Sequence, residues 1–312
     1  MNQAGISRRE ALRLLGAGVA TCAASPLSNA WAAEPPQQKN MLTRAIPSSG
    51  EALPVIGLGT WQTFDVGPTP QVRAPLEEVL NAFVEGGAKV IDSSPMYGSS
   101  EEVVGDLVSK LGLRPKLFLA TKVWTSGKSA GIEQMEASVR KLQANPLDLI
   151  EVHNLVDVET QLETLRDWKR AGRVRYLGIT HYNAGGHEAV ARVLASQAVD
   201  FVQINYSLGE REAERRILPL AQERGVAVIA NRPFAAGDLF RRLRSKPLPA
   251  WASEIECTSW AQVLLKFIIS HPAITCAIPG TAKAEHIRDN LQAGHGRLPD
   301  ENLRARIIAE AT

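Results

Sequence analysis

An acid and a phenol lie close together in the stretch of residues 90–98. An apolar run typical of a buried strand ends at Ile91, and a Ser-Pro pair breaks it. Asp92 ends this strand, and Tyr97 follows five residues later, ahead of a predicted helix. Taken alone, the pattern favours a solvated loop acid and a half-buried tyrosine. Its chemical meaning depends on which other side chains the fold brings to the same loop.

Strands and helices are predicted to alternate along the chain after a short hairpin (43–46 and 51–53). Several of the apolar runs are continuous, as in strands buried on both faces. This alternation predicts eight parallel βαβ units closed into a (β/α)8, or TIM, barrel with an N-terminal β-hairpin. An open doubly wound sheet is the alternative, but Gly57 and Gly59 lack the third glycine of its dinucleotide fingerprint. The predicted strands span residues 55–61, 117–123, 147–152, 174–179, 201–204, 226–230 and 274–278, with one more ending at 91.

The carboxyl ends of barrel strands carry the chemistry in this architecture. Lys122 stands at the end of the third strand and His153 at the end of the fourth. A lysine there needs an anion, which Asp92 can supply, and a cation beside Tyr97 would lower the pKa of the phenol toward neutral pH. Such a set can give a proton to an oxygen while a nicotinamide or similar cofactor supplies the electrons. A barrel hydrolase would instead need paired carboxylates, and Asp92 has only Lys122 as an obvious neighbour.

The chain resembles the aldo-keto reductase family from about residue 43 to residue 293. The resemblance implies that Tyr97 is the general acid, that Lys122 and Asp92 tune it, and that His153 positions the carbonyl. It also implies NADPH, bound extended across the barrel mouth without a Rossmann motif. The matching segments are specific in their order and spacing: Gly57-Leu58-Gly59-Thr60-Trp61, Ile91-Asp92 with Tyr97-Gly98, Thr121-Lys122-Val123, Val152-His153, Gln203-Ile204-Asn205 and Ile278-Pro279-Gly280-Thr281.

At the nicotinamide end, this sequence departs from the family pattern. Thr180 and His181 stand where the family has a Ser-Asn pair that holds the carboxamide together with Gln203. Asn231 stands where an aromatic residue commonly stacks on the nicotinamide. The cofactor contacts that the resemblance implies here are Gly59, Thr60, Trp61, Thr180, His181, Gln203, Asn231, Arg232, Pro233, Phe234, Gly237 and Leu239.

At the adenosine end, the resemblance implies contacts from Gly280, Thr281, Lys283, His286 and Asn290. Gly280 and His286 replace a Lys and an Arg that are common in NADPH-dependent members. Because such cations recognise a 2′-phosphate, their loss weakens the case for NADPH and keeps NADH open as the alternative.

The reaction expected from these residues is reduction of an aldehyde or ketone to an alcohol, with hydride from NAD(P)H and a proton from Tyr97. Trp61, Phe64, Met96 and Asn154 are the candidate lining of the substrate pocket. The alternative is an exported nucleotide-binding sensor or partner protein that keeps the fold with little turnover. The sequence does not identify the carbonyl substrate.

Residues 1–32 resemble a twin-arginine export signal. A paired arginine at Arg8 and Arg9 precedes an apolar run, and small residues end at Ala32, as a signal peptidase requires. The run is too short and too rich in Gly and Ser to span a membrane comfortably. We therefore expect cleavage after Ala32, a linker over 33–41, a barrel over 42–312 and a periplasmic mature protein.

The composition excludes some classes of function. The chain has 312 residues, 45% of them apolar and 22% charged, as in soluble globular proteins. Cleavage would remove three arginines and one glutamate, which lowers the net charge from +2 to about zero and gives no support for binding nucleic acid or an anionic membrane. Cys257 and Cys276 lack metal-ligand spacing, and two buried free thiols are favoured over a disulfide. A monomer or weak oligomer is the default expectation.

Overall fold

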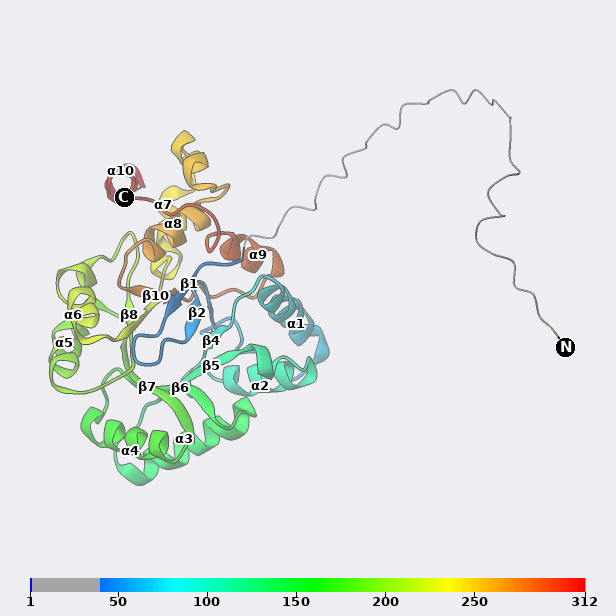
Figure 1. Cartoon of the computed structure of the whole chain (residues 1–312), viewed down its shortest axis with the longest axis vertical. Helices are drawn as coiled ribbons and strands as arrows, with labels where there is room; N and C mark the ends of the chain where they lie inside the picture. The colour runs from blue at the N-terminus through cyan, green and yellow to red at the C-terminus, as the bar shows by residue number, and fades with distance from the viewer. Residues whose placement is uncertain (2–39, 312) are drawn as a thin grey trace. The chain divides into compact units, whose positions relative to one another are not determined.

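The computed structural model describes Met1 and residues 40–311, in which helices surround a ring of strands (Figure 1). The expected export signal and nearly all of the expected linker lie outside the described residues. Within these residues, eight parallel strands are hydrogen-bonded in the order β10-β9-β8-β7-β6-β5-β4-β3. Parallel bridges from Ile56 to Ala277 and from Gly59 to Gly280 join the two ends of this sheet, so the predicted (β/α)8 barrel is confirmed. The strands are β3 (Leu58–Gly59), β4 (Val90–Asp92), β5 (Phe118–Val123), β6 (Leu147–His153), β7 (Val174–His181), β8 (Phe201–Asn205), β9 (Ala227–Asn231) and β10 (Ile274–Ala277).

The predicted hairpin is also present, and it closes the amino-terminal end of the barrel. β1 (Thr43–Ala45) and β2 (Ala52–Pro54) pair antiparallel. Ile46 and Leu53 are fully buried in one apolar cluster with Phe118 and other residues at the starts of the barrel strands. Because apolar side chains fill this end, the carboxyl ends of the strands are left to meet a ligand.

The helices cover the outside of the ring and bury an apolar stripe against the strands. α1 begins at Pro70, a position where a missing amide costs no hydrogen bond. Its Leu76, Val79 and Phe83 lie in the larger apolar cluster between helices and strands. The helices are α1 (Pro70–Glu85), α2 (Ser100–Lys110), α3 (Lys128–Leu142), α4 (Val158–Arg170), α5 (His187–Ser196), α6 (Ile217–Arg224), α7 (Asp238–Leu243), α8 (Trp260–Ile269), α9 (Ala284–Gln292) and α10 (Glu301–Ala311).

The C-terminal helix α10 was not predicted. Its buried residues Leu303, Ile307 and Ala311 are spaced by four, so each turn of the helix presents one apolar residue to the barrel. Because charged residues lie between them, the segment resembles a polar tail unless the four-residue spacing of its apolar residues is considered. Glu310 of this helix accepts a hydrogen bond from Trp251 Nε1 at 2.7 Å, which ties α10 to the segment before α8.

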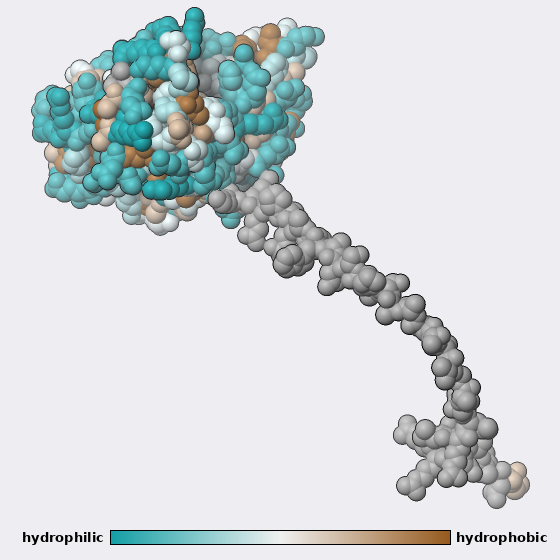
Figure 2. Space-filling view, turned by 90° about the horizontal axis from the view of Figure 1, so that it is seen from above, coloured by the Kyte–Doolittle hydropathy of each residue, from teal (hydrophilic) through white to brown (hydrophobic). Residues whose placement is uncertain are grey.

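The surface in Figure 2 is mainly hydrophilic, with hydrophobic residues in separate patches. No helix among the described residues is both long and apolar enough to cross a bilayer. Cys257 and Cys276 are both free and buried, as predicted. Burial raises the pKa of the Cys257 thiol to about 11.

Candidate active site

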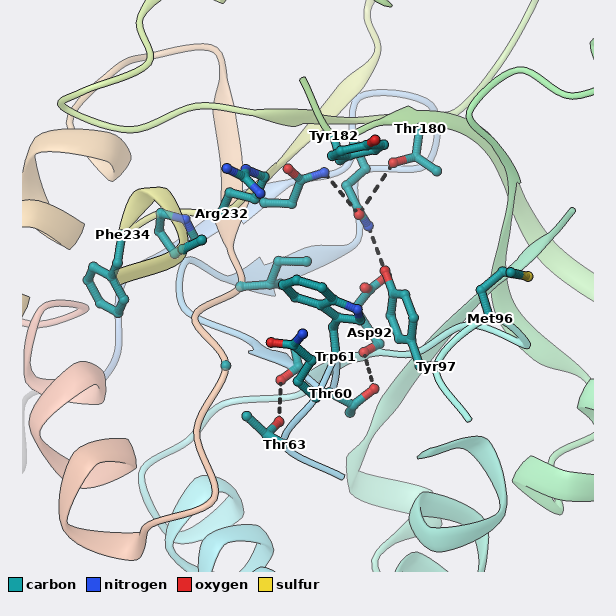
Figure 3. Close-up of a pocket in the computed structure, with 18 of the residues that line it drawn as sticks. Thr60, Trp61, Thr63, Asp92, Met96, Tyr97, Thr180, Tyr182, Arg232 and Phe234 are labelled. Atoms are coloured by element: carbon teal, nitrogen blue, oxygen red, sulfur yellow. Dashed lines mark hydrogen bonds between the residues drawn. The ribbon is translucent and has the colours of Figure 1, made fainter. Parts of the chain in front are cut away.

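A cavity of about 660 Å³ opens at the carboxyl ends of the barrel strands. Asp92 at the end of β4, His153 at the end of β6 and Tyr97 on the loop after β4 all contribute to its wall. Figure 3 shows Tyr97 and Tyr182 bordering the same space. The fourth predicted catalytic residue, Lys122, is fully buried behind Tyr97. The fold therefore brings together the four side chains that the sequence analysis singled out.

Lys122 and Asp92 form a buried ion pair. The Nζ atom of Lys122 lies 2.7 and 2.8 Å from the two carboxylate oxygens of Asp92 and 2.8 Å from the main-chain oxygen of Ser93. Burial lowers the pKa of Lys122, but Asp92, Tyr97 and Glu151 raise it, and the pKa ends above its usual value. The ammonium group therefore stays charged, and its Nζ lies 5.2 Å from the centre of the Tyr97 ring.

The pKa of Tyr97 differs from the sequence-based expectation. That expectation held that a nearby cation would lower the pKa toward neutral pH. In the structure, burial raises the pKa of Tyr97 above its usual value; Lys122 lowers it, whereas Asp92 and Glu151 raise it. The correction follows from the depth of the site, because a buried phenolate loses the hydration that stabilises its charge. Tyr97 is thus a protonated phenol at neutral pH, which suits a proton donor.

His153 is held as a neutral imidazole. Burial, followed by the charge of Lys122 and then His181, lowers its pKa to about 3. Its ring lies 6.2 Å from the Tyr97 ring and nearly perpendicular to it. The Nδ1 atom is 3.4 Å from the Ser94 hydroxyl. A neutral imidazole can donate one hydrogen bond to an oxygen but is a poor source of a whole proton.

Glu151, on β6, is a buried acid next to this group that the sequence analysis missed. The side-chain amide of Gln203 donates to Asp92 Oδ1 at 2.8 Å and to Glu151 Oε2 at 2.9 Å. The residues Leu149, Glu151 and His153 alternate along one strand, and inward-facing positions alternate in the same way. This two-residue alternation could have identified Glu151 as an inward-facing residue. The apolar residues on either side of it made the segment look like an ordinary buried strand.

The residues expected around the carboxamide form hydrogen bonds with one another in this structure. The carbonyl oxygen of Gln203 accepts from Asn231 Nδ2 at 3.2 Å and from Thr180 Oγ1 at 3.4 Å. Since its amide also donates twice, Gln203 already uses both ends of its side chain within the protein. His181 does not line the cavity: its ring stacks on Tyr182, with ring centres 5.7 Å apart. Tyr182 takes its place in the cavity wall.

A second cavity of about 440 Å³ continues from the first toward α9. The two share Phe234, Phe240 and Gly280 in their walls. Of the residues expected at the adenosine end, Gly280, Thr281, His286 and Asn290 line this second cavity. Lys283 lies outside its wall with an exposed side chain, 3.9 Å from Glu285.

Three of the four residues expected in the substrate pocket line the larger cavity, and one does not. Trp61, Met96 and Asn154 line the larger cavity. Phe64 does not: it is fully buried in the apolar core, where its ring packs against other core side chains and cannot reach a substrate. Leu239, which the resemblance places at the cofactor through its backbone amide, has its side chain in the same core. Large exposed apolar residues that the sequence analysis did not single out complete the rim: Trp124, Tyr182 and Phe240.

The polar atoms along these cavities fit an extended dinucleotide. Asn154 Oδ1, Asn231 Oδ1 and Arg232 Nε are buried and find no hydrogen-bond partner among the described residues. All three residues line the larger cavity, where a bound molecule can satisfy such groups. A Cβ atom at Gly59 would lie 3.0 Å from the Ile278 carbonyl oxygen, so glycine lets β3 and the segment after β10 approach closely in the cavity wall.

Comparisons with known proteins agree with this geometry. The Aldo/keto reductase family matches residues 55–307. Methylglyoxal reductase YeaE of Escherichia coli (strain K12) is 31% identical over 258 residues, which cover 80% of this chain and 89% of that protein. A crystal structure of an aldo-keto reductase from Klebsiella pneumoniae in complex with NADPH is 27% identical, with a TM-score of 0.74 over 87% of this chain and 96% of that one. A second Klebsiella structure, in complex with NADP and acetate, is 27% identical with the same TM-score over 88% of this chain and 95% of that one. The chain belongs to the aldo/keto reductase family.

Proposed function

We propose that this protein reduces an aldehyde or ketone to an alcohol with NADPH and that Tyr97 supplies the proton. One observation carries the proposal: the phenol of Tyr97 borders an open cavity, with the buried lysine of the Lys122–Asp92 pair behind it and the His153 imidazole beside it. The Klebsiella relative of the same fold is crystallised with NADPH. The curated relative from Escherichia coli is a methylglyoxal reductase, an enzyme named for a carbonyl substrate.

The walls of the two cavities would hold the nucleotide. Asn231 and Arg232 offer unpartnered polar atoms at the catalytic end, and Thr281 and Asn290 line the adenosine end. When bound, the reduced nicotinamide supplies the hydride, which no protein side chain can deliver. The apolar rim around Trp61 and Trp124 would exclude water from the carbonyl carbon.

Tyr97 and His153 would act on the carbonyl oxygen. A Ser94 hydroxyl that donates to Nδ1 of His153 leaves the imidazole proton on Nε2, from which it can hydrogen-bond the oxygen. As negative charge develops on that oxygen, the phenol of Tyr97 releases its proton to it. The charge of Lys122, held in place by Asp92, stabilises the phenolate that remains.

The test is consumption of NADPH by the full chain with a panel of aldehydes and ketones, together with detection of the alcohol. We expect turnover in the wild-type protein and a loss of about 10²–10⁴-fold in Tyr97→Phe, the usual contribution of a positioned acid. Tyr182→Phe is the matched control, since it removes a hydroxyl from another tyrosine of the same cavity wall. Nucleotide binding without consumption on any carbonyl would instead favour a sensor or partner protein. Equal rates in Tyr97→Phe and wild type would refute the role of Tyr97.

We also propose that the protein is exported to the periplasm by a twin-arginine pathway. The paired arginines, the apolar run after them and the small residues before Ala32 support this proposal. A double Arg8→Lys and Arg9→Lys variant should remain in the cytoplasm in a bacterial host with this pathway, while the wild-type chain reaches the periplasmic fraction. Export of the variant at the wild-type level would contradict the proposal.

A further inference from the structure

Glu151 is a fully buried acid inside the barrel that the proposed reaction does not use. In the register of the sheet it pairs with Lys122 on β5 and with Gly178 on β7. A Cβ atom at position 178 would lie 3.2 Å from Cγ of Glu151, so the glycine leaves the space that the acid occupies. The side chain of Glu151 is therefore closely packed inside the barrel, next to Lys122.

The surrounding charges balance only if Glu151 is neutral. Asp92 already neutralises Lys122, and the same carboxylate accepts a hydrogen bond from Gln203. Glu151 Oε2 accepts the other hydrogen of that amide, and Oε1 finds no hydrogen-bond partner among the described residues. An ionised Glu151 would thus be a second, uncompensated anion at a fully buried position, which is costly.

We propose that Glu151 is a positioning residue for the proton transfer: it holds a proton at neutral pH, and its ionisation at higher pH tightens the hold of Tyr97 on its own proton. The coupling runs through charge. A neutral Glu151 leaves the Lys122 ammonium opposed by a single carboxylate, so part of its field acts on the phenol. An ionised Glu151 adds a second negative charge, which opposes a phenolate at Tyr97 and makes the phenol a weaker acid.

The groups facing Glu151 support this assignment. They are Asp92 from β4, Lys122 from β5 and Tyr97 at the cavity, with His153 two residues further along β6 itself. Burial raises the pKa of Glu151 well above its usual value; Lys122 lowers it and Asp92 raises it. Lys122 is the one cation of this set, because His153 is neutral.

The proposal rests in part on the proposed role of Tyr97 as proton donor. We therefore choose readouts that do not require turnover, so that a failure of that role can be told apart from a failure of this proposal. The first readout is infrared spectroscopy of the full chain near neutral pH. We expect the carbonyl stretch of a protonated carboxylic acid in the wild-type protein and its loss in Glu151→Gln. Glu151→Met, a second neutral variant of similar length, should lack the same band. A carboxylate signal for Glu151 at neutral pH would overturn the proposal.

The second readout is the ultraviolet titration of the Tyr97 phenol, isolated by subtracting Tyr97→Phe from each protein. Removing the negative charge that Glu151 gains at alkaline pH should lower the midpoint by about one pH unit in Glu151→Gln, a tenfold change in the equilibrium. Glu151→Asp, which keeps an acid, should titrate closer to the wild type. Unchanged midpoints in Glu151→Gln and Glu151→Met would overturn the proposal even if the infrared band is present.

Glu101 provides a matched control. It is also almost fully buried, burial raises its pKa, and one of its oxygens has no partner among the described residues. Its carboxylate accepts from Thr121, which precedes Lys122 and so points to the other face of β5. Glu101→Gln should remove an acid band but leave the Tyr97 midpoint in place. An equal shift in this variant would show that any buried acid has the effect and would overturn a specific role for Glu151.

Discussion

The charged side chains are buried at one end of the cleft and exposed at the other. At the catalytic end, Lys122 and Asp92 are 2.7 Å apart with side chains that are 0% and 3% exposed. At the other end, where we propose that the adenosine binds, Lys283 and His286 lie 3.9 and 3.7 Å from Glu285, and all three side chains are more than half exposed. Water weakens charges at the second end but not at the first.

The two ends should therefore tolerate sequence variation to different degrees. A buried charge must have its partner, so replacing either member of the Lys122–Asp92 pair disturbs the barrel itself. An exposed cation contributes little to the stability of the fold, so a chain can have Gly280 and His286 in place of a Lys and an Arg at small cost in stability. The catalytic end should therefore respond strongly to single substitutions and the adenosine end weakly.

The largest expected effect is that of Lys122→Met. It leaves the Asp92 carboxylate buried without a cation, which should lower the free energy of unfolding by about 3–5 kcal/mol and abolish turnover. Chemical denaturation followed by circular dichroism measures this change. The double variant Lys122→Met with Asp92→Asn should recover part of the stability, because no unpaired charge remains. A single variant as stable as the wild type would break the contrast between the two ends.

A smaller effect is expected from pH acting on Glu151. Its pKa in the folded protein lies above its ordinary value of 4.5, so the folded state keeps a proton that the unfolded chain releases. The stabilisation from this proton is complete below pH 4.5 and is lost as pH rises through the pKa of the folded state, at about 1.4 kcal/mol per pH unit.

Chemical denaturation gives the free energy of unfolding of the wild type and of Glu151→Gln across this pH range. The difference between the two isolates the contribution of Glu151, since all other titratable groups are shared. We expect the stability difference between the two proteins to move in favour of Glu151→Gln as pH rises. A difference that stays constant with pH would mean that Glu151 is ionised in the folded protein.

The smallest expected effect is at the adenosine end. Lys283→Ala removes an exposed cation, and exposed ion pairs contribute about 0.2–1 kcal/mol, so the dissociation constant for NADPH should rise by no more than about fivefold. The constant for NADH, which lacks the 2′-phosphate, should not change. Nucleotide titration by fluorescence measures both. A similar loss for the two nucleotides would show that Lys283 does not discriminate between them.

The sequence allowed the barrel and most of the catalytic end to be predicted, because both follow from periodicity. Strand ends fix which residues reach the mouth of a barrel, and Asp92, Lys122 and His153 stand at such ends. The hairpin could be predicted from its turn, since Pro47-Ser48-Ser49-Gly50 separates two short segments.

The remaining features depend on packing that a linear pattern does not encode. The side chain of His181 stacks beside Tyr182 instead of entering the cavity, and its ring packs over Gly186, a contact that depends on how the loop after β7 folds back. Phe64 follows a loop yet points into the core. The pKa of Tyr97 depends on burial depth, which outweighs the nearby lysine that the sequence did reveal.

The most direct test of the account is a single-turnover measurement with Tyr97→Phe. The full-length variant is loaded with NADPH, mixed with the best carbonyl substrate of the wild-type protein, and followed by nicotinamide absorbance. We expect unchanged nucleotide affinity and a rate of NADPH oxidation about 10²–10⁴-fold below wild type. Oxidation at the wild-type rate would contradict it, because the proton would then reach the carbonyl oxygen from another group.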